Sequence, residues 1–326
     1  MVSENTQCRT VAASGKHESP VPVAVILGPT AAGKSSVALA LARKYGWEII
    51  SCDSRQLYRG MDIGTAKPSP EERTAVPHWL IDHLDPSEEY SAWRFADEAA
   101  AIIRERAKAG KKVVICGGTG LYFRALQTGQ TERVPSDPAV RKQLADFVLQ
   151  QGSAVLHREL TAVDPVTASH LHPNDTQRII RALALYRQTG KTIADYSGEE
   201  NPPFDMRFTV VKLAMDRSLL YERINRRVEE MRNRGLRGEF LHLRKAGYDR
   251  YSPGMQSVGY KELFEVEEGR STMDDAAELI KRNTRRYAKR QITWLAHKVE
   301  GITVDAADPA EQIDKAEICF REAGLC

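Results

Sequence analysis

Long apolar runs are absent from this sequence of 326 residues. No stretch of about 18 consecutive apolar residues occurs, so we expect no membrane-spanning helix and no membrane partner. The first residues show no apolar segment behind a positive start, which argues against a secretory signal. The five cysteines form no C-x-x-C pair, so neither a zinc ribbon nor a disulfide framework is favoured. Together these absences predict a cytoplasmic protein in a reducing compartment.

An excess of one charge sign is lacking too. Lys and Arg number 47 against 44 Asp and Glu, which gives a net charge of +3. This balance does not by itself indicate a nucleic-acid partner, although a local cluster of basic residues still can. Hydrophobic residues make up 42% of the chain and charged residues 28%, as in an ordinary globular protein with one large or two modest domains.

Short apolar segments alternate with helical ones in the first part of the chain. Such alternation is typical of an α/β fold, with a parallel sheet and helices on both of its faces. The expected strands are residues 21–27, 47–51, 78–81 and 111–116, and the expected helices are 34–44 and 91–109.

The pattern changes after Gly129. Helical stretches without a convincing strand fill residues 138–190, Asn201-Pro202-Pro203 breaks the chain, and residues 208–214 are typical of a strand again. The predicted organisation is a disordered tail at 1–20, an α/β core at 21–129 and 207–326 with a helical C-terminal region, and a helical insertion at 130–203.

A phosphate-binding motif lies between the first expected strand and the first expected helix. Residues 28–35, GPTAAGKS, match G-x-x-x-x-G-K-[ST]. The glycines allow backbone N–H groups to surround a phosphate, and the start of a helix adds positive potential. Lys34 supplies a charge and Ser35 a hydroxyl for Mg²⁺. The motif predicts a polyphosphate site on a P-loop NTPase-like sheet, without deciding whether ATP is bound or hydrolysed.

Acidic residues follow two of the other expected strands. Asp53 comes after the second strand and Asp82 after the third, whereas the fourth ends in Gly117. A carboxylate at Asp53 would stand at the carboxyl edge of the sheet, where open α/β sheets bind ligands, and could act there as a general base. The alternative, an Asp that only caps a turn, stays open at this point.

Further motifs follow the phosphate loop in a fixed order. They are Asp53-Ser54-Arg55-Gln56-Leu57-Tyr58, Met61-Asp62-Ile63-Gly64-Thr65-Ala66-Lys67-Pro68, Gly117-Gly118-Thr119-Gly120-Leu121-Tyr122, His172-Pro173-Asn174-Asp175, Gln177-Arg178-Ile179-Ile180-Arg181, Val258-Gly259-Tyr260 and Lys289-Arg290-Gln291-Ile292-Thr293-Trp294-Leu295. This series, from residue 23 to about 297, resembles the tRNA dimethylallyltransferase (tRNA isopentenyltransferase) family. The loop alone is generic, whereas the ordered series is highly specific.

The resemblance implies a reaction and its partners. A five-carbon dimethylallyl group would pass from dimethylallyl diphosphate to the exocyclic amino nitrogen of the adenosine 3′ to the anticodon of tRNA, giving N6-(dimethylallyl)adenosine and diphosphate. The enzyme would bind the anticodon stem-loop as a monomer and use Mg²⁺, with Ser35 as the metal residue. The donor's diphosphate, not ATP, would then occupy the loop residues Gly28, Pro29, Thr30, Ala31, Ala32, Gly33, Lys34 and Ser35.

The resemblance also assigns catalytic roles. Asp53 would accept the proton that the amino group loses, and Thr30 would lie near the reacting atoms. Arg227 would bind the leaving diphosphate, with Arg223 as the next candidate. The periodicity of residues 216–234 agrees, because in a helix Arg227 would lie nearest the edge of the apolar stripe Leu220, Ile224, Val228 and Met231, whereas Arg226 and Arg232 would point outward.

A basic segment is the main sign of an RNA surface. Residues 281–290 hold six Lys or Arg and no acid, and composition alone allows either RNA binding or pairing with the acidic residues 265–268. The resemblance favours RNA. The residues it predicts to bind tRNA are Asp53, Ser54, Arg55, Gln56, Thr119, Arg141, Gln177, Arg178, Ile179, Ile180, Arg181, Gln256, Ser257, Val258, Gly259, Tyr260, Lys261, Lys289, Arg290 and Gln291.

Other functions stay open on the residues themselves. A small-molecule kinase would use ATP with Asp53 as the base on a hydroxyl, and an isopentenyltransferase could act on free adenylate instead of tRNA. A third alternative is an RNA-binding module with a vestigial loop, against which the intact Lys34, Ser35 and Asp53 argue. Donor choice distinguishes a kinase from the tRNA enzyme, and acceptor size distinguishes the adenylate enzyme from it.

Overall fold

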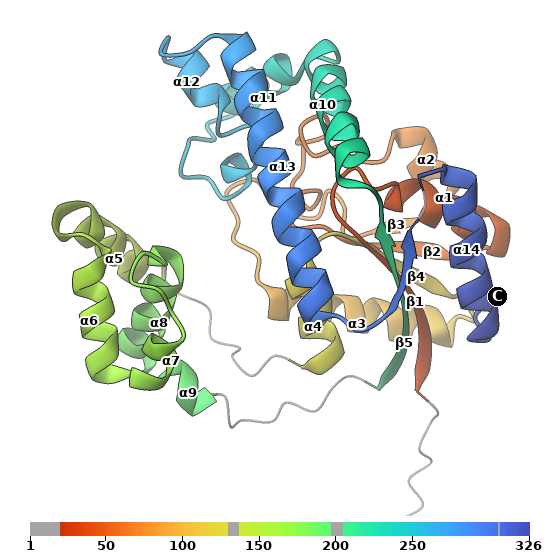
Figure 1. The fold of residues 1–326 in the computed structure, drawn as a ribbon, viewed down its shortest axis with the longest axis horizontal. Coiled ribbons are helices and arrows are strands. Elements are labelled where there is room, and N and C mark those ends of the chain that lie inside the picture. The colour runs from red at the N-terminus through yellow and green to blue at the C-terminus, as the bar shows by residue number, and fades with distance from the viewer. Residues whose placement is uncertain (1–19, 130–136, 197–204, 306) are drawn as a thin grey trace, which may run out of the picture.

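The centre of the molecule is a single parallel sheet. The computed structural model describes residues 20–129, 137–196, 205–305 and 307–326. Within these residues six strands pair in the order β3-β2-β4-β1-β5-β6, and each neighbouring pair is parallel (Figure 1). The strands are β1 (Val21–Leu27), β2 (Glu48–Cys52), β3 (His78–Trp79), β4 (Val113–Gly117), β5 (Met206–Ala214) and β6 (Ile302–Asp305).

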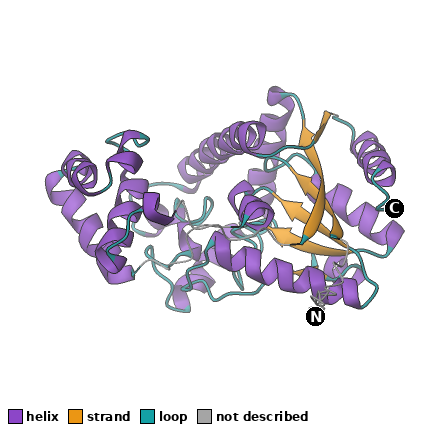
Figure 2. Cartoon of the chain, turned by 90° about the horizontal axis from the view of Figure 1, so that it is seen from below, coloured by secondary structure: helices purple, strands orange, loops and turns teal. Residues whose placement is uncertain are grey.

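Helices cover both faces of the sheet (Figure 2). In β1, Val23, Val25 and Leu27 enter one hydrophobic cluster while Ala24 and Ile26 enter another, because successive side chains of a strand point to opposite faces. The first cluster includes side chains of α3 (Ala92–Lys108) and α4 (Gly120–Thr128), and the second includes those of α1 (Lys34–Tyr45) and α14 (Pro309–Glu322). The predicted α/β fold with a parallel sheet is therefore confirmed.

Five helices form a separate group, which we call the helical group (green in Figure 1). They are α5 (Pro138–Gln151), α6 (Ser153–Val163), α7 (Pro165–Ser169), α8 (Thr176–Thr189) and α9 (Ile193–Tyr196). Leu144, Leu156, Leu160 and Leu183 are fully buried in a cluster made only of residues from this group. The segments that join the group to the sheet lie outside the described residues, and so does the predicted break at Asn201-Pro202-Pro203.

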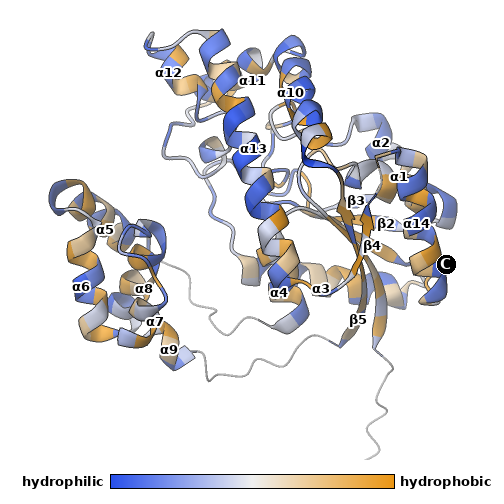
Figure 3. Ribbon diagram, viewed as in Figure 1, coloured by the Kyte–Doolittle hydropathy of each residue, from blue (hydrophilic) through white to orange (hydrophobic). Residues whose placement is uncertain are grey.

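The C-terminal half adds long helices beside the sheet. They are α10 (Arg217–Asn233), α11 (Leu236–Lys245), the short α12 (Leu263–Glu267) and the 26-residue α13 (Met273–Lys298), with a 3-10 turn at Gly254–Gln256. The remaining helix, α2 (Pro70–Ala75), precedes β3. Hydrophilic residues cover much of α10 and of the upper part of α13 (Figure 3). None of the described helices is long and apolar enough to cross a membrane.

Several elements differ from the sequence prediction. The third strand was expected at 78–81 but ends at Trp79, because Leu80 and Asp82 adopt positive φ angles of 59° and 51° that a strand cannot contain. Strand β6 and helix α14 were not predicted at all. Only Val304 of the four residues of β6 is buried, so the apolar signal of this edge strand is weak.

Candidate functional site

The phosphate loop joins the end of β1 to the start of α1, as predicted. Gly33 is the residue before the helix and has φ 97°, a left-handed conformation that glycine adopts without steric cost. Ala31 also has a positive φ of 66°, so the loop turns tightly before the helix. The Lys34 Nζ donates a hydrogen bond to the carbonyl oxygen of Pro29 at 2.7 Å, which folds the lysine side chain back over the loop.

A cavity of about 380 Å³ opens beside this loop. Its walls come from the phosphate loop, the end of β2, residues 64–68, α10, residues 256–261 and α13, so segments from all over the core meet here. The predicted site residues that line it are Thr30, Lys34, Ser35, Asp53, Arg55, Gln56, Arg227, Gln256, Ser257, Val258, Lys261, Arg290 and Gln291.

Asp53 follows the last residue of β2 and lines the cavity. Its Oδ1 accepts hydrogen bonds from the backbone N–H of Arg55 at 2.8 Å and of Gln56 at 3.4 Å. The carboxylate therefore caps a turn and faces the cavity at once, so the two alternatives for Asp53 are compatible. The other acid, Asp82, forms ion pairs with Lys67 and Arg73 and is not among the lining residues.

Two cations lie in the electrostatic reach of Asp53. Burial lowers the pKa of Lys34, and nearby Arg227 lowers it as well, whereas Asp53 opposes this shift. Burial also lowers the pKa of Arg227, again against the influence of Asp53. Since withdrawal from water disfavours the charged form of Lys34, an anion bound between these two cations would restore the lost stabilisation.

Helix α10 aims Arg227 into the cavity as its periodicity predicted. Leu220, Ile224 and Val228 are buried, and Arg227 lies next to them among the lining residues. Arg223 is placed differently, because its Nη2 donates to the carbonyl oxygen of Ala307 at 2.6 Å and it is not in the cavity wall.

The outward positions of Arg226 and Arg232 are confirmed. Both are exposed, and they pair with Glu230 at 3.8 Å and Asp274 at 2.6 Å respectively.

The wall near Asp53 is held by bonds within the protein. Gln56 Oε1 accepts from Ser51 Oγ at 3.2 Å, and its Nε2 donates to the carbonyl oxygens of Thr65 and Ala66 at 3.4 and 3.2 Å. The backbone N–H of Ser54 donates to Thr119 Oγ1 at 3.0 Å, so these two predicted residues stand just behind the cavity. Both ends of the Gln56 amide are therefore bonded to protein groups, which fixes this side chain in the cavity wall.

A residue that the sequence analysis missed holds the segment 62–64. Glu239 of α11 accepts hydrogen bonds from the backbone N–H groups of Asp62, Ile63 and Gly64 at 2.8, 2.8 and 3.1 Å. It also accepts from Tyr260 Oη at 2.5 Å. No local signal marks a single glutamate on a helix whose partners lie about 175 residues earlier.

Glu239 explains the place of Tyr260. This tyrosine is fully buried, and Gly64 leaves room for its ring, since a Cβ at position 64 would lie 2.4 Å from Tyr260 Cε2. Ser257 is buried as well, with its Oγ donating to the carbonyl oxygen of Gly254 at 2.6 Å. Gly259 is buried next to them, whereas Gln256 and Lys261 are exposed.

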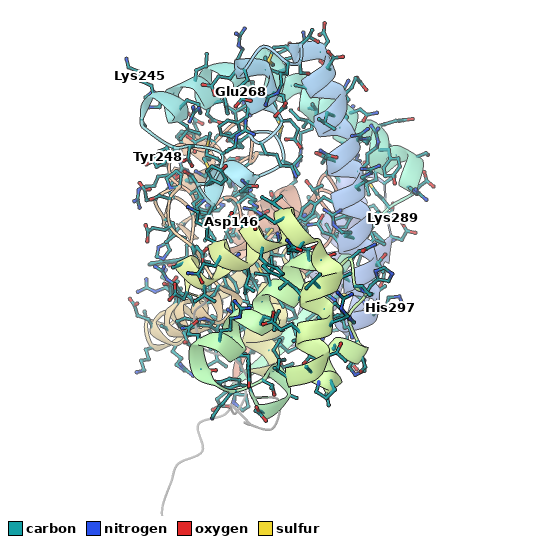
Figure 4. All side chains as sticks on the ribbon, turned by 90° about the vertical axis from the view of Figure 1, so that its left-hand side faces the viewer. Asp146, Lys245, Tyr248, Glu268, Lys289 and His297 are labelled. Carbon is teal, nitrogen blue, oxygen red and sulfur yellow. The ribbon has the colours of Figure 1, made fainter. Side chains whose placement is uncertain are left out.

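Helix α13 has one face toward the cavity and another toward solvent. Tyr287, Arg290 and Gln291 line the cavity, whereas Lys289 of the same turn is exposed (Figure 4). Burial raises the pKa of Tyr287 to about 12, with Asp53 adding to the shift, so the phenol is neutral at physiological pH. With Lys289, the exposed Arg282 and Arg286 form a stripe at i, i+4 and i+7, which we call the basic stripe.

The acidic residues 265–268 do not neutralise this helix. Glu265 and Glu268 form ion pairs with Arg270 and Arg250. Lys281, at the start of the basic segment, pairs instead with Glu229 of α10 at 2.5 Å. The alternative that residues 281–290 pair with 265–268 is therefore wrong.

The predicted residues of the helical group separate into two kinds. Gln177 and Arg178 are exposed, while Ile179 and Ile180 are buried in the group's own cluster, so their side chains hold the helix together.

Two arginines of the helical group lie near the core. Arg141 Nη1 pairs with Glu89 Oε1 at 2.8 Å. Burial lowers the pKa of Arg181, and the same Glu89 opposes the shift, so both arginines lie in the field of one glutamate.

Neither a nucleophilic thiol nor a metal cluster marks the described part of the site. Burial raises the pKa of Cys52 and raises that of Cys116 to about 11, which keeps both thiols protonated. No group of three or more His, Cys, Asp or Glu gathers among the described residues.

Comparison with known proteins identifies close relatives. The family model described as IPP transferase matches residues 56–298. The chain is 46% identical to "tRNA dimethylallyltransferase 2" of Geotalea uraniireducens, covering 85% of this chain and 90% of that protein. It is 47% identical to "tRNA dimethylallyltransferase" of Carboxydothermus hydrogenoformans, covering 83% of this chain and 87% of that protein.

Solved structures agree with these relatives. A tRNA isopentenylpyrophosphate transferase from Bacillus halodurans has a TM-score of 0.67 at 39% identity, covering 93% of this chain and 96% of that one. A eukaryotic dimethylallyltransferase described as acting on tRNA has a TM-score of 0.77 at 28% identity, covering 94% of this chain and 79% of that one.

Proposed function

The chain belongs to the IPP transferase family, and we propose that it transfers a dimethylallyl group from dimethylallyl diphosphate to the exocyclic amino nitrogen of the adenosine 3′ to the anticodon of tRNA. The observation that carries the proposal is the cavity in which Asp53 lies beside two cations, Lys34 and Arg227, at the phosphate loop. A kinase is not favoured, because relatives that match over most of the chain are named tRNA dimethylallyltransferases, not phosphotransferases.

The donor side of the reaction needs a site that stabilises negative charge. As the carbon–oxygen bond of an allylic diphosphate breaks, charge grows on the leaving diphosphate. Lys34, Arg227 and the loop amides would bind that charge, and fixed donors of this kind supply much of the rate enhancement of such enzymes. The loop residues Gly28, Ala31, Ala32 and Gly33 would contribute through their backbone N–H groups. Pro29 has no N–H, and its carbonyl oxygen instead accepts a hydrogen bond from Lys34 Nζ.

The acceptor side needs a base. The adenine amino nitrogen forms the new bond to the allylic carbon and must lose a proton, which the Asp53 carboxylate would accept. Thr30, which is part of the phosphate loop, lines the cavity and would lie next to the reacting atoms. Because the target base is stacked in the anticodon loop, it must leave the stack to reach Asp53, at a cost of a few kcal/mol.

A divalent cation fits the donor set of this site. Ser35 is exposed and lines the cavity at the first turn of α1, so its hydroxyl can hold one ion together with diphosphate oxygens and water. Mg²⁺ is commonly bound this way, with few protein ligands, which agrees with the lack of an acidic or histidine cluster among the described residues. The ion would supply charge neutralisation on the leaving diphosphate.

Two surfaces would bind the tRNA. The basic stripe of α13 lies on the helix that also lines the cavity, so RNA bound along it would lie next to the active site. The helical group carries Gln177, Arg178, Arg141 and Arg181, and we propose that it closes over the anticodon stem. Identical hydrogen-exchange protection of residues 137–196 with and without tRNA would contradict this closure.

One reaction tests the proposed function. The protein is mixed with Mg²⁺, dimethylallyl diphosphate and unmodified tRNA that has an adenosine 3′ to the anticodon. The tRNA is then digested to nucleosides, and their masses are measured by mass spectrometry. A second tube replaces tRNA with AMP, a third supplies ATP in place of the donor, and a fourth omits Mg²⁺. The proposal predicts an adenosine heavier by one dimethylallyl group only with tRNA and Mg²⁺. Steady ADP release without a heavier nucleoside would show a phosphotransferase instead.

A further inference from the structure

The side chain of Gln291 joins two loops of the active site. It is buried in α13, 7% exposed, and lines the cavity. Its Oε1 accepts a hydrogen bond from the backbone N–H of Thr30 at 2.9 Å, and its Nε2 donates to the carbonyl oxygen of Gly118 at 2.9 Å. One amide thus connects the phosphate loop after β1 to the turn after β4.

The orientation of this amide is fixed by chemistry. A backbone N–H needs an acceptor and a backbone C=O needs a donor, and the glutamine amide offers both from one planar group at any physiological pH. Gly118 leaves the space for it, because a Cβ at this position would lie 2.3 Å from Gln291 Nε2. Both ends of the side chain face protein groups, so the amide is placed to hold the loops and not to meet RNA.

The bonded atoms belong to the part of the site where the reaction takes place. Thr30 lines the cavity, and the turn that contains Gly118 begins at Gly117, which lines it too. Tyr287, one helical turn before Gln291, faces the same cavity and lies in the field of Asp53. The inner face of α13 therefore contacts the loop that would hold the diphosphate, while the exposed Lys289 of that turn faces solvent.

We infer that Gln291 is a positioning residue for the transfer step, which sets the phosphate loop at Thr30 against the turn at Gly118, and that it is not a tRNA contact. The inference rests on the proposed function and deepens it, because it assigns to the donor site a residue that the family resemblance placed on the RNA surface. Misplacement of reacting groups by about 1 Å costs roughly 100-fold in rate, so loss of this support should appear in the chemical step.

Gln291→Met tests the inference, because it keeps the length of the side chain and removes both hydrogen bonds. Wild type, Gln291→Met and the exposed neighbour variant Ile292→Val are compared by single-turnover transfer at saturating tRNA and by filter binding of tRNA. We expect Gln291→Met to lower the transfer rate by about 10- to 100-fold while its tRNA affinity stays within about twofold. Ile292→Val should match wild type in both measurements.

Two further variants separate positioning from simple loss of stability. Gly118→Ala pushes the Gln291 amide away with a single methyl group and should reproduce the slow transfer. Gln291→Glu can accept and donate only when its carboxyl group is protonated, so its rate relative to wild type should rise as pH falls from about 8 to about 6. A merely structural role predicts no such pH dependence.

The outcomes are distinct. Wild-type transfer rates at saturating tRNA in Gln291→Met, with or without weaker tRNA binding, would overturn the inference and return Gln291 to the RNA surface. If Gln291→Met does not fold, a wild-type rate in Gly118→Ala would overturn it equally. An absence of transfer in the wild-type protein itself would instead overturn the proposed function, and the inference with it.

Discussion

The cavity of the α/β core and the helical group use polar residues in opposite ways. In the cavity wall, Gln56 and Gln291 are each bonded to protein groups at both ends of the amide, and Asp53 is bonded to its own turn. In the helical group Gln177 and Arg178 are exposed, while apolar residues such as Ile179 make up the buried cluster. The arrangement in the cavity wall holds polar groups in fixed positions, whereas the arrangement in the helical group exposes polar and charged side chains to solvent.

This difference corresponds to two tasks of the proposed enzyme. Bond breaking depends on charged and polar groups that are held in place before the reaction. Such groups stabilise the charge that develops in the transition state, and they do so less well when they are free to move. Binding of an RNA backbone depends on charge that neutralises phosphate, which tolerates mobile side chains and falls with salt. Variants in the cavity should therefore change the rate of transfer, and variants on the outer surfaces should change tRNA affinity.

Asp53→Ala should give the largest effect. Loss of the base that accepts the amino proton should lower the single-turnover rate by about 10²- to 10⁴-fold, while binding of the donor survives. The exposed acid Asp146 of α5, seen in Figure 4, offers a matched control, and Asp146→Ala should retain the wild-type rate. Near wild-type turnover in Asp53→Ala would remove the base assignment.

Arg227→Ala should give the second-largest loss of transfer rate. Removal of a cation from the cavity should slow transfer by about 10²- to 10³-fold, since charge on the leaving diphosphate loses a fixed partner. Arg232 lies on the same helix but points outward to Asp274, so Arg232→Ala should change the rate by less than about twofold. Equal effects of the two substitutions, measured under the same single-turnover conditions, would contradict the place of Arg227 in the site.

Neutralising the basic stripe should weaken tRNA binding without slowing chemistry. Changing Arg282, Arg286 and Lys289 together to Gln should make the slope of log affinity against log salt shallower by about 2 to 3. The control changes Arg43, Lys108 and Lys111 to Gln, which removes the same charge from exposed positions elsewhere on the core. If both triple variants changed the salt slope equally, tRNA affinity would depend only on the net charge of the protein and not on the basic stripe.

Arg178→Ala should give the smallest effect. One exposed arginine of α8 that contacts a phosphate contributes about one unit of salt slope and a few-fold in affinity. Arg158 of α6 is also exposed but belongs to no predicted site, so Arg158→Ala is the matched control. Unchanged tRNA affinity in Arg178→Ala would exclude this part of the helical group from the RNA surface.

The sequence predicted what depends on local patterns. The phosphate loop, the strands at 21–27 and 208–214 and the inward position of Arg227 all follow from motif, composition and helical period. The structure has them, with the second of these strands beginning two residues earlier, at Met206. Asp53 was placed correctly because the carboxyl ends of parallel strands meet at one edge of the sheet.

What the sequence could not predict depends on contacts between distant segments. Glu239 holds backbone groups of residues 62–64, and Gln291 joins Thr30 to Gly118, at separations that no local period records. Tyr260 was assigned to the RNA surface with its motif but is fully buried, since a motif does not distinguish a residue that contacts the substrate from one that supports the wall. Strand β6 was missed because it is short and mostly exposed.

The most direct test of the division between the two regions is a paired measurement on Arg227→Ala and Arg178→Ala. For each variant the single-turnover transfer rate at saturating tRNA and the dissociation constant for unmodified tRNA are determined under the same conditions. The account predicts a large loss of rate with unchanged tRNA affinity for Arg227→Ala, and weaker affinity with an unchanged rate for Arg178→Ala. Loss of affinity in Arg227→Ala, or loss of rate at saturation in Arg178→Ala, would contradict it.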